Sequence, residues 1–142
     1  MKLRSLVTLL VACGLEIGCS QADGPACHPT YGTVTLDGSP LAEAMIVLHP
    51  LDADADNSPR PLAYANSEGY FELTTIRPGD GAPAGKYAIT VELRELKPDG
   101  DEMVRDGQNL LPDRYRDPKT SGFRCTVVPG ENELSPLDVK SQ

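Results

Sequence analysis

The chain has 142 residues, of which 24% are charged and 5% aromatic, and it contains no tryptophan. This length suits one domain of ordinary size and leaves no room for two independent cores. The formal net charge of −8 argues against a nucleic-acid-binding protein and against docking on an anionic lipid surface.

The first eighteen residues have the composition of an export signal. Lys2 and Arg4 form a positively charged start, residues 5–17 are mostly apolar, and small residues gather around Cys19. The segment is too short and too interrupted for a lasting transmembrane helix. We therefore predict a signal peptide at 1–18, a polar tether at 19–29, one folded domain at 30–140, and export to the cell envelope.

Three processing sites compete within this segment. Cleavage before Cys19 would leave that cysteine for lipid, although Glu16 stands where a lipoprotein signal has an aliphatic residue. Residues 10–12 match the lipoprotein signal better and would place cleavage before Cys13, but the apolar part of the signal peptide after Arg4 is then very short. Residues 20–22 would suit an ordinary signal peptidase and release a protein without lipid. We favour lipidation of Cys19, which would hold the protein on a membrane, facing the periplasm or the exterior.

The number of cysteines left in the mature chain also bears on which processing site is used. Cleavage before Cys19 or after Ala22 leaves Cys27 and Cys125 as a pair, whereas cleavage before Cys13 would add a third thiol. An oxidising compartment favours a disulfide between the pair. Such a bond would close a loop of about 100 residues and contribute roughly 4–5 kcal/mol in the chain-entropy model. The absence of a Cys-x-x-Cys motif argues against a cysteine metal site.

The first predicted elements are a strand at 32–36, a turn at Asp37-Gly38 and a strand at 44–50. Asp-Gly accepts the positive φ angles of a type I′ turn, so we predict that the two strands form a hairpin. The strand at 44–50 is apolar on both faces and should therefore lie centrally.

The rest of the chain continues in short strands with no convincing helix. In the strand at 70–75, Phe71 and Leu73 should face inward, and residues 97–121 read as a long charged connection. A helix could be drawn only at 101–111. Pro136 makes the last strand an edge strand or a bulged one. The remaining strands are predicted at 62–65, 70–75, 87–93, 123–127 and 134–139, giving an all-β, seven-stranded Greek-key sandwich.

Two motifs stand out in the chain: Asp37-Gly38-x-Pro40-Leu41-x-x-Ala44-x-Ile46 and Ser67-x-Gly69-Tyr70-Phe71-x-Leu73-x-Thr75. They resemble the carboxypeptidase regulatory-like domain. Later elements are Asp80-Gly-Ala-Pro-Ala-Gly85-x-Tyr87-x-Ile89-Thr90-Val91, Leu111-Pro112-x-x-Tyr115, Thr120-Ser121-Gly122 and Val128-x-Gly130-x-Asn132. With these the chain resembles small bacterial exported lipoproteins built from one such domain. The resemblance implies a transthyretin-like sandwich without enzymatic activity, over residues 30–139.

The chain contains no recognisable catalytic constellation. Gly-x-Ser-x-Gly, His-Glu-x-x-His and P-loop motifs are all missing from the sequence. The hydroxyisourate hydrolases of the transthyretin fold use several histidines and a terminal Tyr-Arg-Gly-Ser. This chain has only His28 and His49 and ends Val139-Lys-Ser-Gln142. We predict no catalytic residue and no enzyme; a hydrolase hypothesis would depend on His49.

An acidic loop invites comparison with a calcium site. Asp52, Asp54 and Asp56 alternate like the first ligands of an EF-hand, but Asn57 and Ala63 stand where that loop requires glycine and glutamate. An EF-hand is excluded, and a solvated loop or a weak surface calcium site remains. We assign no metal ligand and no cofactor.

The tyrosines are the other candidates for binding. Tyr64, Tyr70 and Tyr115 could stack on a sugar, whereas Phe71 and Tyr87 are predicted to face inward. We interpret Tyr115 as a latch for its loop and keep it as a weak binding candidate. The favoured hypothesis is a non-catalytic, envelope-anchored structural or protein-interaction module; the alternative is a cell-surface carbohydrate-binding module. Its partner, an envelope protein or a glycan, is not identified by the sequence.

Overall fold

The computed structural model describes residues 24–52 and 54–142. The predicted signal peptide and the processing sites at Cys13, Cys19 and residues 20–22 lie outside this part of the chain. Within the described residues, no helix is long and apolar enough to cross a membrane.

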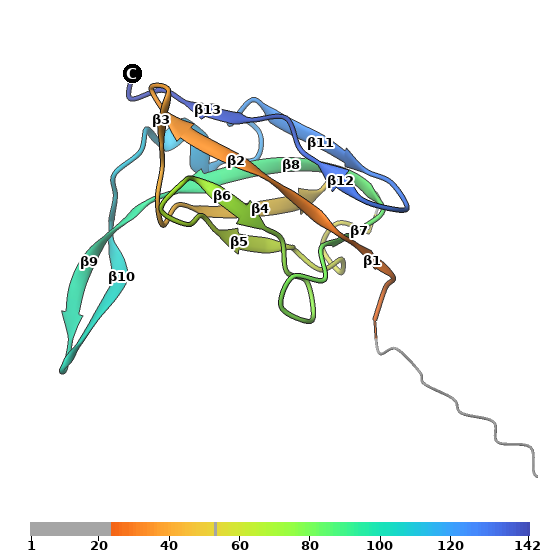
Figure 1. Cartoon of the computed structure of the whole chain (residues 1–142), viewed down its shortest axis with the longest axis horizontal. Helices are drawn as coiled ribbons and strands as arrows, with labels where there is room; N and C mark the ends of the chain where they lie inside the picture. Colours follow the sequence, from red (N-terminus) through yellow and green to blue (C-terminus); the bar gives the residue numbers. More distant parts are fainter. Residues whose placement is uncertain (1–23, 53) are drawn as a thin grey trace, which may run out of the picture.

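The described chain folds into two β-sheets that face each other, as the sequence predicts (Figure 1). In the first sheet the strand order is β11-β8-β4-β5, and all neighbours are antiparallel. Its strands are β4 (Met45–Pro50), β5 (Leu62–Tyr64), β8 (Gly85–Glu92) and β11 (Phe123–Val127). The all-β sandwich is thus confirmed.

The second sheet is built around β2 (Thr30–Leu36). Strands β3 and β6 pair with β2 in the antiparallel sense, and β12 and β13 pair with it in the parallel sense. Pro136 separates β12 from β13, and β13 lies at the end of the strand order, as predicted for a proline-containing final strand. The bounds are β3 (Ser39–Pro40), β6 (Tyr70–Glu72), β12 (Asn132–Glu133) and β13 (Leu137–Val139).

Two ribbons and one short helix complete the described chain, which is therefore divided more finely than the seven predicted strands. One ribbon pairs β1 with β7 and the other pairs β9 with β10. The bounds are β1 (Cys27–His28), β7 (Ala82–Pro83), β9 (Arg94–Asp99), β10 (Glu102–Asn109) and the 3-10 helix η1 (Asp113–Arg116).

The turn at Asp37-Gly38 forms as predicted, but its hairpin is much shorter. The two residues have φ angles of 49° and 86°, and the turn pairs β2 only with Ser39 and Pro40. Strand β4, the predicted partner, pairs instead with β5 and β8 in the opposite sheet. The buried side chains of Leu41 and Ala44 draw the connecting segment inward between the sheets, so β4 starts in the other layer. Its central position agrees with its two apolar faces.

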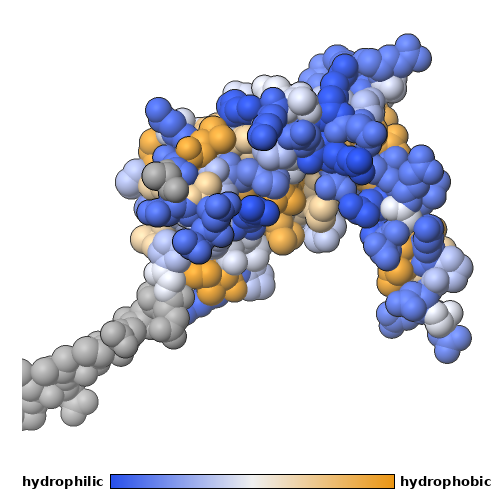
Figure 2. Space-filling model, turned by 180° about the vertical axis from the view of Figure 1, so that it is seen from behind, coloured by the Kyte–Doolittle hydropathy of each residue, from blue (hydrophilic) through white to orange (hydrophobic). Residues whose placement is uncertain are grey.

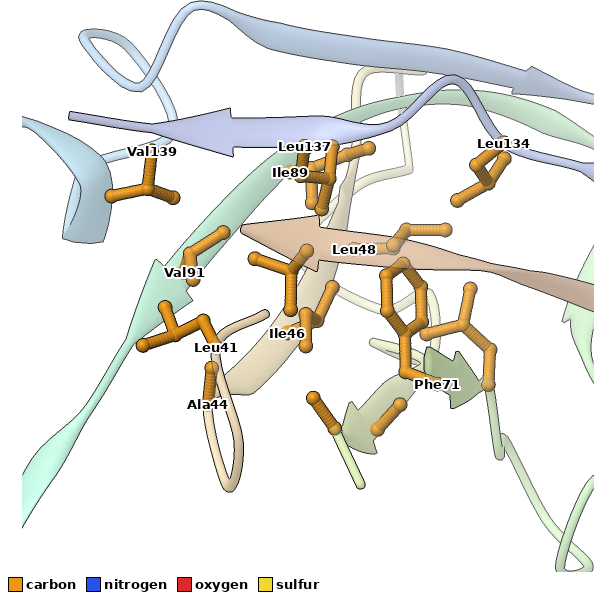
Figure 3. Close-up of a cluster of buried hydrophobic side chains, with 14 of the residues drawn as sticks. Leu41, Ala44, Ile46, Leu48, Phe71, Ile89, Val91, Leu134, Leu137 and Val139 are labelled. Carbon is orange, nitrogen blue, oxygen red and sulfur yellow. The ribbon is translucent and has the colours of Figure 1, made fainter. Parts of the chain in front are cut away.

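The core lies between the sheets and is lined by alternate residues of the long strands (Figure 3). Phe71, Leu73 and Tyr87 are buried, which confirms the inward faces predicted for their strands. Burying each large apolar side chain contributes about 1.5–3 kcal/mol relative to exposure. Further core residues are Val34, Ile46, Leu48, Ile89, Val91, Val127, Leu134, Leu137 and Val139.

The prediction of a long irregular connection at 97–121 is wrong for most of its length. Strands β9 and β10 form a hairpin around Gly100-Asp101 that projects from the sandwich (Figure 1), so residues 101–111 are not helical. The residues of this segment are mostly polar or charged, because both faces of the ribbon are in contact with solvent. Only the end of the segment, around η1, remains a short non-strand connection.

Candidate functional site

An open groove of about 430 Å³ lies on the outer side of the second sheet. We call it the tyrosine groove; its lining residues are Pro29, Thr30, Tyr31, Tyr70, Glu72, Gly79 and Glu131. Strand register places these side chains: Tyr31 on β2 lies opposite Glu72 on β6 and beside Glu133 on β12. Residues directly in register share one face of a sheet, so the ring of Tyr31 is flanked by carboxylates on both sides.

The two tyrosine rings of the groove are neighbours, and both hydroxyls are engaged. The ring centroids of Tyr31 and Tyr70 are 6.0 Å apart, with the rings tilted by 41°. The Tyr31 hydroxyl donates to Glu131 Oε1 at 2.9 Å, and the Tyr70 hydroxyl donates to Glu72 Oε1 at 2.9 Å. The groove therefore combines two half-buried aromatic rings with two fixed carboxylates.

These hydrogen bonds change the acidity of the phenols. The bond to Glu131 is the main reason that the pKa of Tyr31 is raised. For Tyr70, desolvation raises the pKa first, and the bond to Glu72 adds to it. Both hydroxyls stay protonated at neutral pH and act as donors to their carboxylates.

Tyr115, the weak binding candidate from the sequence, is only 5% exposed. Its ring stacks on Phe123 with centroids 5.7 Å apart, and its hydroxyl accepts from the backbone N–H of Lys140 at 2.9 Å and from Arg114 Nη2 at 2.8 Å. The side chain thus fastens η1 to the end of the last strand. Its ring is not open to a ligand in this structure.

The other aromatic candidates divide by exposure. Phe71 and Tyr87 are buried, and burial raises the pKa of Tyr87 to about 12. Tyr64 is 62% exposed on β5, in the sheet opposite the tyrosine groove. Of the aromatic candidates that the sequence suggested, only Tyr70 lies in the groove.

The disulfide expected between Cys27 and Cys125 is not formed: both residues are free thiols. Cys27 on β1 lies beside the loop of Thr75 and Asp80, while Cys125 on β11 is paired with Tyr87. Desolvation is the first cause that raises the pKa of Cys27, and burial raises the pKa of Cys125 to about 11. Both sulfurs are therefore protonated at neutral pH and weakly nucleophilic.

The histidines do not assemble a catalytic group with each other. His49 Nε2 lies 2.8 Å from the Thr90 hydroxyl on the neighbouring strand, and burial lowers the pKa of His49. His28 Nδ1 accepts from the backbone N–H of Gly130 at 3.3 Å. In the described residues, no three histidine, cysteine or acidic side chains are grouped as a metal site would require.

The second candidate surface is the projecting hairpin of β9 and β10. Leu96 and Met103 are 49% and 59% exposed, and the register Leu96–Arg105 and Pro98–Met103 places both on one face. In Figure 2 the projecting part carries hydrophobic colour among hydrophilic neighbours. Arg105 lies on the same face nearer the sandwich, so the exposed part of the face is the outer part that carries Leu96 and Met103.

The base of the projecting hairpin is fixed to the sandwich. Arg105 forms an ion pair with Glu43 and donates from Nη1 to the backbone oxygen of Arg94 at 2.7 Å. Asn109 Oδ1 accepts from the backbone N–H of Leu93 at 3.1 Å. A register shift between Arg105 and Asn109 makes a bulge there. The ribbon is therefore held at its base and free along both outer edges.

Comparison of the sequence with models of known families and with curated proteins finds no match. Two solved structures are similar. A DUF3823 family protein from Parabacteroides merdae is 16% identical, with a TM-score of 0.42; the match covers 82% of this chain and 47%, about half, of that protein. A proposed carbohydrate binding protein from Pseudomonas aeruginosa is 13% identical, with a TM-score of 0.42, over 82% of this chain and 89% of that one.

Sequence reasoning missed Tyr31, Glu72 and Glu131 as members of one groove. Tyr31 could have been predicted, because it lies on the face of β2 opposite the buried Val34, and an aromatic ring on an outer face is a binding signal. The two carboxylates could not have been predicted as its neighbours, because their proximity depends on β6 and β12 flanking β2.

Proposed function

We propose that the protein is a non-catalytic module, exported and held at the cell envelope by lipid on Cys19, whose projecting hairpin binds an extended segment of another envelope protein. The outer edge of β10 is the contact: a third strand would add to the ribbon there. Export and lipidation are supported by the sequence of the first nineteen residues.

The observation that carries this proposal is the free edge of β10. Pro98 has no N–H, so the pair Pro98–Met103 belongs to the non-hydrogen-bonded type of an antiparallel ladder. The N–H and C=O of Met103 consequently point outward, and alternation gives the same direction to Arg105. The β9 edge lacks the donor at Pro98, whereas residues 102–106 of β10 contain no proline. Strand addition is thus better supported at β10.

A third strand would stabilise the projecting hairpin. A two-stranded ribbon is only marginally stable in water, and three strands with a hydrophobic face are more stable. Leu96 and Met103 already provide that face. A bound strand would pair with the open backbone groups of β10, and its own side chains would pack beside Met103 on this face.

Charge indicates the kind of segment. Residues 94–109 contain five acidic and three basic side chains, and the whole chain has a net charge of −8. Electrostatic complementarity therefore favours a partner segment with net positive charge. Two copies of this chain would repel each other, which disfavours self-association through the same edge.

In-cell photo-cross-linking tests the proposal in the native host. A photoreactive residue at Glu102 should give a discrete adduct with an envelope protein, and one at Val128, which is exposed after the end of β11, should not. Met103→Pro removes the outward N–H and should abolish the adduct, whereas Met103→Leu keeps the N–H and apolar contact and should retain it.

Two results would contradict this proposal. An adduct that survives Met103→Pro would show that strand addition is not the mode of binding. An adduct with the mass of a dimer, matched by sedimentation of purified protein as a dimer, would identify a second copy as the occupant.

A second candidate function is carbohydrate binding at the tyrosine groove. The specific observation in its favour is the pair of adjacent rings, Tyr31 and Tyr70, beside hydrogen-bonding carboxylates. Aromatic rings with an apolar body and polar neighbours suit a ligand that has apolar faces and hydroxyl edges. This groove is in the second sheet and is distinct from the projecting hairpin.

A further inference from the structure

We infer that the tyrosine groove selects a ligand that carries an ammonium group. This inference deepens the second candidate function and rests on the same groove, but it names a chemical class that carbohydrate binding alone does not require. It is independent of the projecting hairpin.

The rings supply the first part of an ammonium site. Tyr31 and Tyr70 line one groove, and their centroids are 6.0 Å apart, so one small cation can contact both rings. A cation within about 6 Å of a tyrosine ring is attracted by the negative potential of the ring face. Half-buried rings desolvate that cation only in part, which suits a reversible, weak ligand.

The carboxylates supply the second part. Glu131 and Glu72 each accept a phenol hydrogen bond through Oε1, which leaves Oε2 and further lone pairs for a ligand. The raised pKa values of Tyr31 and Tyr70 keep both phenols protonated, so these bonds persist and hold the carboxylates beside the rings. An ammonium donates three N–H groups and matches such acceptors.

The balance of charge supplies the third part. The ion pairs among the described residues are Arg94–Glu92, Arg105–Glu43, Arg116–Asp113 and Lys140–Asp138. Glu72, Glu131 and Glu133 are in none of them, and all three are exposed around Tyr31. Within the described chain, the groove lining includes no lysine or arginine. A cationic ligand would balance this charge, whereas an anionic ligand would be repelled.

Gly79 is a further feature of the tyrosine groove. Gly79 lines it with a φ of 71°, and its N–H donates to the Thr74 hydroxyl at 3.0 Å. A Cβ at this position would lie 3.6 Å from Glu72 Oε2, the oxygen that the phenol of Tyr70 does not use. Such a Cβ would be in ordinary van der Waals contact with this oxygen, so the glycine leaves one side of the oxygen uncovered.

An ammonium group could reach the groove on an amino sugar or on a lysine side chain. Both share the chemistry that the groove recognises. Titration of isotope-labelled protein by NMR distinguishes them, with the ring signals of Tyr31 and Tyr70 as the readout. The probes are glucosamine, glucose, N-acetylglucosamine and Nα-acetyl-lysine methylamide, each at constant ionic strength.

We expect glucosamine, the lysine derivative or both to shift these ring signals, with glucose and N-acetylglucosamine at least about threefold weaker, as an exposed cation–π contact implies. Glu72→Gln and Glu131→Gln, which keep an acceptor oxygen for the phenols, should each weaken the ammonium probes by about two- to fivefold. Glu68→Gln makes the same charge change in an exposed turn and should leave binding unchanged.

The outcomes separate the two ideas. If neutral and cationic sugars bind equally, carbohydrate binding holds and the ammonium inference is overturned. If only the lysine derivative binds, the ammonium inference holds and the carbohydrate function fails. If no probe shifts the two rings, or if the glutamine variants bind as the wild type does, the inference is overturned.

Discussion

Asp80 organises the loop between β6 and β7 through its carboxylate. Oδ1 accepts the backbone N–H of Thr75 at 2.7 Å, and Oδ2 accepts those of Ile76 and Arg77 at 3.0 and 2.9 Å. Burial of the group raises its pKa, but the three backbone hydrogen bonds outweigh this, and the pKa of Asp80 is lowered overall. Three backbone donors are satisfied by one charged side chain, in a loop that the sequence marks only by its glycines and prolines.

We expect Asp80→Ala to reduce the free energy of unfolding by about 1–3 kcal/mol at neutral pH, because three backbone donors lose a charged acceptor. The lowered pKa means that the native state binds this proton less readily than the unfolded state. The contribution is therefore complete above the unfolded pKa of about 4 and is lost as pH falls through the lower folded value.

Urea unfolding at pH 7 and pH 3 measures this effect. Asp80→Asn keeps the shape and one acceptor oxygen, so it isolates the part that depends on charge. The difference between wild type and Asp80→Asn should shrink at pH 3. A difference that is the same at both pH values would show that the charge of Asp80 contributes nothing.

The two cysteines test the redox state of the molecule. Raised pKa values should make native Cys27 and Cys125 slow to react with iodoacetamide near neutral pH, with Cys125 the slower because it is the more strongly shifted. After denaturation without reductant, intact mass should show two alkylated thiols. A species that takes up label only after reduction would contradict the assignment of free thiols and support the disulfide between Cys27 and Cys125.

At the scale of elements, the strands with a core face were predictable and the projecting hairpin was not. Strands β6 and β8 alternate large apolar residues with small or polar ones, because the large apolar residues of each pack in the core. Strands β9 and β10 have no core face, so their only apolar signals, such as Leu96 and Met103, are isolated in a charged segment. Such a ribbon has the composition of a loop.

Gly107 is the residue on which the bulge of the projecting hairpin depends. A Cβ there would lie 2.5 Å from the Glu95 Cβ and 2.8 Å from the Glu95 backbone oxygen. We expect Gly107→Ala to force β9 and β10 apart at the base of the ribbon, at a local cost of about 1–3 kcal/mol. The sandwich should stay folded, because the hairpin contributes little to its core.

Amide chemical shifts and exchange rates measure this local change. Gly100→Asn is the matched control: its φ of 63° is tolerated by asparagine, and a Cβ there meets open space. Altered shifts confined to 94–109 in Gly107→Ala, and small changes in Gly100→Asn, would agree with this account. Native-like shifts at Glu95 in Gly107→Ala would contradict it.

At the scale of the whole molecule, the sequence predicted the sandwich but not the crossing of the chain between its layers. Asp37-Gly38 correctly predicted a turn, yet the strand after it belongs to the opposite sheet, because buried Leu41 and Ala44 lead the chain across the core. The tyrosine groove depends on the same pairing. Its residues come from the start of β2, from β6 and the loop after it, and from the turn before β12, which only the three-dimensional arrangement brings together.

Hydrogen exchange of residues 102–106, measured by mass spectrometry, tests the central claim, strand addition at β10, most directly. It should be compared between purified protein and protein in native-host envelope membranes. In the purified protein the outward amides of Met103 and Arg105 should exchange rapidly, and in the membranes their exchange should slow by about tenfold or more, with the amide of Val128 unaffected. Equal, rapid exchange in both samples would contradict strand addition at this edge.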